Sequence, residues 1–87
     1  MLDEMIGHHV VVDLSSQFVC LGTLRRADVL HLELEDADLH DLRDTRTTRE
    51  NYVAAALATG IKRNRKRVLL ARTEVVAVAR ADDVVAD

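Results

Sequence analysis

Residues 30–39 read LHLELEDADL and contain the clearest alternation of apolar and polar side chains in this chain. Successive side chains of a β-strand point to opposite faces, so the first three leucines are predicted to share one face. After Leu34 the apolar positions change from even to odd numbers. A parity shift of one residue is the effect of a β-bulge, and we therefore predict one long strand that kinks near residues 35–36.

Two further strands are predicted upstream of this segment, over residues 8–14 and 18–26. Gly22 lies in the middle of the second strand, where a glycine usually marks a sharp bend or a close approach of two backbones. Short turns at residues 15–17 and 27–28 join the three strands. No segment between them is long enough for a crossover helix, which excludes parallel βαβ units and predicts an antiparallel meander.

The alternation stops after the third strand, and an insertion with helical and basic parts is predicted over residues 40–66. Thr47 and Glu50 fit a capping box, which predicts a short helix over residues 51–58. Gly60 stands where the C-cap of that helix is expected. The insertion therefore separates the third strand from the fourth without adding a second domain.

The last third of the chain begins with five cations in the six residues 62–67, which we interpret as a loop. Two short β-branched strands are predicted next, over residues 68–72 and 75–79, around a minimal turn. An acidic tail occupies residues 81–87 and has no predicted structure. The predicted order is three strands, a helix and two strands, after a short N-terminal turn of helix.

The length of 87 residues allows one domain and one core, which we predict over residues 1–87. A sheet that closes on itself suits this length, since closure removes exposed edges. The predicted fold is mainly β: a small, strongly bent, closed antiparallel barrel of five strands, with a helical insertion between strands three and four. A domain this small is marginally stable alone, and pairing with copies of itself would stabilise it.

The composition bounds the cellular setting of the protein. No stretch approaches the roughly 20 apolar residues of a membrane span, and the N-terminus lacks an apolar signal core. We therefore expect a cytoplasmic location and no membrane partner. The single cysteine, Cys20, falls inside a predicted strand and has no partner for an internal disulfide, so a buried apolar role is expected.

The net charge of −3 conceals a separation of charge along the chain. Residues 1–44 carry ten acidic against three basic side chains, whereas residues 45–80 carry nine basic against two acidic ones. Such a separation suits either a nucleic-acid surface or complementary faces of neighbouring subunits. Composition leaves both possibilities open.

Two segments of the chain together form a bipartite pattern. The first spans residues 7–37 and includes Gly7, Val10, Val12, Leu14, Gly22-Thr23-Leu24, Asp28 and Leu32-Glu33-Leu34-Glu35-Asp36-Ala37. The second spans residues 68–78 and is centred on Arg72 and VVAV at 75–78. Together they resemble the signature of the Sm-like ribonucleoprotein family, in a divergent, bacterial-type form. The resemblance implies an SH3-like barrel that assembles into a homo-oligomeric ring, a hexamer or heptamer, by pairing strand five of one subunit with strand four of the next. The interface residues under this reading are Val68, Leu70, Val75, Val76 and Val78.

The family binds single-stranded, often uridine-rich RNA at the inner rim of the pore. Residue by residue, Asp28 fits the acid of the turn between strands two and three, and Arg72 fits the arginine between strands four and five. His31 stands where the family has an asparagine, Thr73 stands where it has a glycine, and the first turn is one residue shorter than usual. A histidine can stack and hydrogen-bond, so Asp28, His31 and Arg72 are the candidate pore residues.

The basic run has two interpretations that the sequence leaves open. Its cations would contact RNA phosphates, or they would be solvated or dock on the acidic third strand of a neighbour. The candidate RNA-binding cations are Lys62, Arg63, Arg65, Lys66 and Arg67. Phe18 and Tyr52 are too few aromatic residues for a stacking platform, so RNA contact would rest mainly on charge.

No pattern of catalytic or metal-binding residues stands out in the sequence. His8 and His9 are adjacent and would point to opposite faces of a strand, and one cysteine leaves no paired ligand spacing. Ser15 lies in a predicted turn rather than a nucleophile elbow, and no glycine-rich phosphate loop exists. We expect no enzyme activity, no cofactor and no metal. The first hypothesis is an RNA-binding ring, and the alternative is a ring-forming scaffold or protein-interaction module without RNA.

Overall fold

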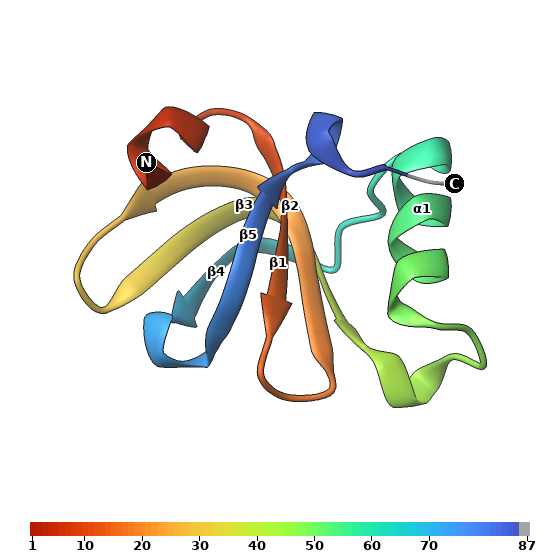
Figure 1. Cartoon of the computed structure of the whole chain (residues 1–87). Coiled ribbons are helices and arrows are strands. Elements are labelled where there is room, and N and C mark those ends of the chain that lie inside the picture. The colour runs from red at the N-terminus through yellow and green to blue at the C-terminus, as the bar shows by residue number, and fades with distance from the viewer. Residues whose placement is uncertain (86–87) are drawn as a thin grey trace.

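The computed structural model of the chain describes residues 1–85 and is mainly β (Figure 1). Five antiparallel strands form one sheet in the order β4-β3-β2-β1-β5. The strands are β1 (His9–Leu14), β2 (Phe18–Ala27), β3 (His31–Asp41), β4 (Arg65–Ala71) and β5 (Val75–Arg80). The helix α1 (Arg49–Thr59) lies between β3 and β4, as predicted, and the 3-10 turns are η1 (Leu2–Met5), η2 (Leu42–Asp44), η3 (Arg72–Glu74) and η4 (Ala81–Asp83). Among the described residues, no helix is long and apolar enough to cross a membrane.

The sheet is open, which corrects the prediction of a closed barrel. Within residues 1–85, β4 pairs only with β3, and β5 pairs only with β1. The turn η3 connects β4 to β5 along the chain. The two strands do not pair with each other, because they lie at opposite ends of the strand order. Both strands are therefore edges, each with one side of its hydrogen-bond ladder unpaired within this part of the chain.

The predicted kink in the third strand is confirmed. The register of β2 against β3 shifts by one residue beside Gly22, and Asp36 on β3 adopts a positive φ of 49°. A Cβ atom on Gly22 would stand 3.0 Å from the Cα of Ala37 and 3.0 Å from the carbonyl oxygen of Glu35. The glycine therefore permits the close approach of two backbones at the point where β3 bends.

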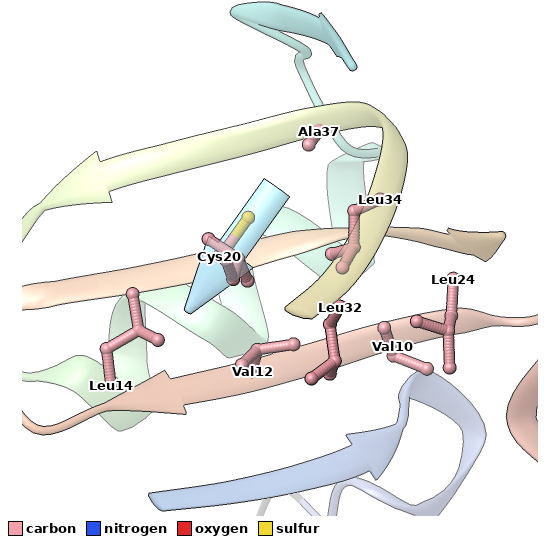
Figure 2. Packing of buried hydrophobic residues seen from close by; sticks show 9 residues of the cluster. Val10, Val12, Leu14, Cys20, Leu24, Leu32, Leu34 and Ala37 are labelled. Atoms are coloured by element: carbon pink, nitrogen blue, oxygen red, sulfur yellow. The ribbon is translucent and has the colours of Figure 1, made fainter. Parts of the chain in front are cut away.

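The main core lies inside the bend of the sheet, where alternate side chains of the strands meet (Figure 2). Its buried members are Val10, Val12, Leu14, Cys20, Leu24, Leu32, Leu34, Ala37 and Leu70. Leu30 was expected to share this face, but it is 66% exposed because β3 begins at His31 and Leu30 lies in the preceding turn. Cys20 is fully buried, and burial raises the pKa of its thiol to about 12, in agreement with an apolar role.

Helix α1 packs on the opposite face of the sheet (Figure 1). A second buried cluster joins it to β1 and β2 and consists of Val11, Val19, Leu21 and Val53. The N-cap is Thr48, whose hydroxyl accepts a hydrogen bond from the N–H of Asn51 (3.1 Å), so the predicted N-cap, Thr47, is one residue too early. Gly60 is the C-cap with a φ of 95°, as predicted.

Strand β4 begins three residues earlier than predicted, at Arg65, so residues 65–67 belong to a strand rather than a loop. Their register places them beside the acidic part of β3, with Arg67 opposite Glu35 and Arg65 opposite Ala37. Opposite charges on neighbouring strands stabilise this pairing. The acid opposite Arg67 lies 32 positions earlier in the chain, so the run of cations resembles a loop when its own sequence is considered alone.

Candidate functional site

The turn between β2 and β3 brings Asp28 and His31 next to Arg72, which lies 44 positions beyond Asp28. Nη1 of Arg72 donates to the carbonyl oxygen of Asp28 (2.5 Å), and the backbone N–H of Arg72 donates to the carbonyl oxygen of Leu30 (2.8 Å). Nδ1 of His31 lies 3.9 Å from a carboxylate oxygen of Asp28. The three candidate pore residues therefore lie together at one corner of the sheet.

The carboxylate of Asp28 stabilises its own turn. It accepts hydrogen bonds from the backbone N–H groups of His31 (2.7 Å) and Leu30 (2.8 Å), and these bonds lower the pKa of Asp28. The N–H of Asp28 in turn donates to the carbonyl oxygen of His31 (2.9 Å). Asp28 thus forms an Asx turn, in which its carboxylate is occupied by backbone N–H groups. The exposed side chains of His31 and Arg72 supply the hydrogen-bond donors that a ligand would meet at this corner.

The same turn holds two aliphatic side chains in solvent. Val29 is 86% exposed and Leu30 is 66% exposed. The hydrogen bonds of Asp28 and Arg72 fix the backbone that carries them. The corner therefore combines polar side chains at its base with an apolar tip.

Two cations of the basic run form ion pairs with acids of β3. Nη1 of Arg63 lies 2.5 Å from a carboxylate oxygen of Asp36, and Nη2 of Arg67 lies 3.0 Å from Oε1 of Glu33. The sequence alone leaves open that the run docks on the acidic third strand of a neighbouring subunit. These pairs instead lie within one chain, which reduces the positive charge that the run presents to a ligand.

The other three cations of the run, Lys62, Arg65 and Lys66, are exposed. Within residues 1–85 they form no ion pair, although Arg65 donates a hydrogen bond to the carbonyl oxygen of Asn64 (3.1 Å). The charge of these three cations is therefore not offset by a paired acid in this part of the chain.

Arg25 and Arg26, at the end of β2, are functional candidates that sequence reasoning missed. Nε of Arg25 lies 3.3 Å from a carboxylate oxygen of Glu35, and Nη2 of Arg26 lies 2.7 Å from Oε1 of Glu33. Arginines of β2 and β4 therefore flank the acidic strand β3 on both sides. An Arg-Arg pair followed by a tight turn and an alternating Glu strand was the available signal, because a hairpin places such charges across from one another.

The residues expected at a ring interface differ in exposure. Four of them lie in or against the core of their own chain: Val68, Leu70, Val75 and Val78. Val76, the fifth, is 68% exposed on β5, and Leu69 is an exposed neighbour of the expected residues on β4. Val76 and Leu69 are thus large apolar side chains that the two edge strands present to solvent.

No group of three or more metal-ligating side chains occurs within the described residues. No known protein family has a sequence profile that matches the chain, and no curated protein is similar enough in sequence to count as a match.

Proposed function

We propose that this chain is an Sm-like subunit that forms a ring with copies of itself and binds single-stranded RNA at the rim of the pore. The observation that supports this best is the meeting of Asp28, His31 and Arg72 at one corner, from distant segments of the chain. His31 offers a ring for stacking and Arg72 offers donors for phosphate or base edges.

The ring would form by antiparallel pairing of β5 of one copy with β4 of the next. The two edge strands have similar lengths, seven residues in β4 and six in β5, and each carries an exposed aliphatic side chain. Pairing them would satisfy the unpaired backbone groups of both edges. Because the two surfaces of the joint differ, repeated joints produce either a closed ring or an open filament.

Native mass spectrometry at low ionic strength tests the ring. We expect a hexamer or heptamer from the wild-type chain and a monomer from Val76→Lys, because a charge on an edge strand opposes strand addition. Val85→Lys is the matched control, since Val85 is also exposed but lies outside the strands, and it should leave the assembly unchanged. A wild-type chain that stays monomeric at every concentration would exclude the ring.

The salt dependence of RNA affinity tests the basic run. For single strands, each phosphate contact contributes about 0.7 to the slope of log K against log salt concentration. Arg65→Ala/Lys66→Ala should therefore reduce the slope by about 1.4 and weaken binding to all sequences similarly in fluorescence anisotropy titrations. Arg63→Ala is the control, and it should leave the slope unchanged because Asp36 already neutralises Arg63. An unchanged slope in the double variant would remove the run from the RNA surface.

A scaffold ring without RNA is the second candidate, and the apolar tip favours it. Val29 and Leu30 suit contact with an apolar protein surface better than contact with a polar base edge. The ratio of absorbance at 260 and 280 nm, measured on protein purified without nuclease at low salt, separates the two functions. Co-purified nucleic acid supports the RNA-binding ring, and a clean protein spectrum supports the scaffold.

A further inference from the structure

One buried carboxylate holds two exposed guanidinium groups on the face of β3 opposite to the core. Oε1 of Glu33 accepts hydrogen bonds from Nε (3.2 Å) and Nη2 (2.7 Å) of Arg26 and from Nη2 of Arg67 (3.0 Å). Glu33 is 8% exposed, whereas the side chains of Arg26 and Arg67 are 73% and 58% exposed. The arginines come from β2 and β4, and the carboxylate comes from β3 between them.

The side chains of Arg26, Arg67 and Glu33 together carry a net charge of +1, because two guanidinium cations share one carboxylate, and Asp28 is a further carboxylate beside Arg26. A guanidinium has five N–H donors, so the pair has ten, and the three bonds to Glu33 leave seven for a ligand. The bonds from Arg26 and Arg67 lower the pKa of Glu33, so the carboxylate loses its charge only when the pH falls below the range of an ordinary glutamate. A fixed carboxylate keeps both side chains in place, which reduces the entropy lost when a ligand binds.

Neutralisation of an acid does not require such a pair, as Arg43 demonstrates elsewhere in the chain. Nε and Nη2 of Arg43 donate to the carboxylate of Asp41, the shortest of these bonds being 2.7 Å, and the Arg43 side chain is 68% exposed. That pair has one cation for one anion and no net charge. The second arginine on Glu33 is therefore in excess of what the carboxylate needs.

A hollow of about 220 Å³ opens beside the cluster. It is lined by Arg26, Ala27, Asp28, His31, Glu33 and Leu69. His31 and Leu69 supply a flat ring and an apolar side chain, and the charged groups of the lining are Arg26 and the carboxylates of Asp28 and Glu33. A net positive charge beside the hollow therefore depends on Arg67, which is bonded to Glu33 but is not one of the lining residues. A ligand that carries both a phosphate and a planar ring matches this combination, because the phosphate takes guanidinium donors while the ring packs in the hollow.

We infer that Arg26 and Arg67, positioned by Glu33, form a phosphate-binding site for a nucleotide on the outer face of the sheet. Phosphate is the anion that forked guanidinium groups match best, since each group donates two parallel N–H bonds. The phosphate belongs either to the backbone of single-stranded RNA or to a free nucleotide. Binding of the RNA backbone rests on the proposed function, whereas binding of a free nucleotide does not. Neither requires that copies of the chain assemble into an oligomeric ring.

An NMR titration of the full chain tests the site by following the Nε–H signals of individual arginines. The probes are inorganic phosphate, uridine monophosphate and a single-stranded RNA oligonucleotide. We expect saturable shifts of the Arg26 and Arg67 signals and none of the Arg43 signal, which reports an equally exposed but neutral pair. Arg67→Ala should weaken the response of Arg26 at least about tenfold, because a charge-assisted hydrogen bond is lost and the remaining pair is neutral. Arg43→Ala should leave that response unchanged.

The three probes identify the source of the phosphate. Saturation by uridine monophosphate supports a free nucleotide, and saturation by RNA with competition from inorganic phosphate supports the RNA backbone. Shifts of Arg26 that never exceed those of Arg43, or an Arg26 response that survives Arg67→Ala, would overturn the site. Native mass spectra report the ring separately, so the ring and this site can fail independently.

Discussion

Gly22→Val is expected to destabilise the fold by about 3 kcal/mol or more. The added Cβ would stand 3.0 Å from the Cα of Ala37 and 3.0 Å from the carbonyl oxygen of Glu35, and these backbone atoms move only if β3 moves. For a domain of this size each kcal/mol lowers the Tm by roughly 4–8 °C, so we expect a loss of at least about 12 °C. Thermal unfolding followed by circular dichroism measures this loss.

Gly7→Ala separates this clash from backbone strain. Gly7 has a φ of 86°, and a Cβ there would meet no atom within 4 Å, so we expect only the left-handed cost of roughly 1–2 kcal/mol. Ala37→Gly added to Gly22→Val should recover less than half of the lost stability, because the Cβ of Ala37 is only one of three close atoms. A Gly22→Val chain with the wild-type Tm would contradict the close approach of the two strands.

Leu32→Ala is expected to reduce the free energy of unfolding by about 2–5 kcal/mol, whereas Leu30→Ala should change it by about 0.5 kcal/mol at most. Leu32 is fully buried and Leu30 is largely exposed, although both belong to the same alternating run. A cavity is created only where the removed methyl groups were packed. Urea unfolding in the Val76→Lys background, which we expect to be monomeric, measures both changes.

Equal losses for the two leucine variants would contradict the observed start of β3 at His31. They would place Leu30 in the core, as its position in the alternating run first predicted. A loss at Leu30 that appears only at concentrations where copies assemble would instead indicate that another copy covers the turn.

The strands and their bend were predictable because the responsible signals are local. The alternation around Leu32 and Leu34, the parity change near Asp36 and the glycine at position 22 all act within one hairpin. The helix was predictable for the same reason. Its N-cap was missed by one residue because Thr47 has the capping-box spacing to Glu50, whereas the observed cap, Thr48, has Asn51 at that spacing.

The candidate site was predictable only in part. The structure brings Asp28, His31 and Arg72 to one corner, but the use of the Asp28 carboxylate inside its own turn depends on the turn's geometry. The roles of Arg26 and Arg67 depend on which acid stands across from them. Sequence reasoning found the cations of the basic run, but it had no means of deciding which of them were already paired.

The sequence by itself determined the order of elements along the chain, the faces of the strands, the kink in β3 and the burial of Cys20. The tertiary structure alone decided that β4 and β5 remain unpaired edges, that β4 begins at Arg65, and that Glu33 holds two arginines. The physical reason is the range of the forces involved. Side-chain alternation and backbone preference act between neighbouring residues. Edge pairing and charge neutralisation depend instead on the register between strands, and the partners can be 7 positions apart, as Arg26 and Glu33 are, or 34 apart, as Arg67 and Glu33 are.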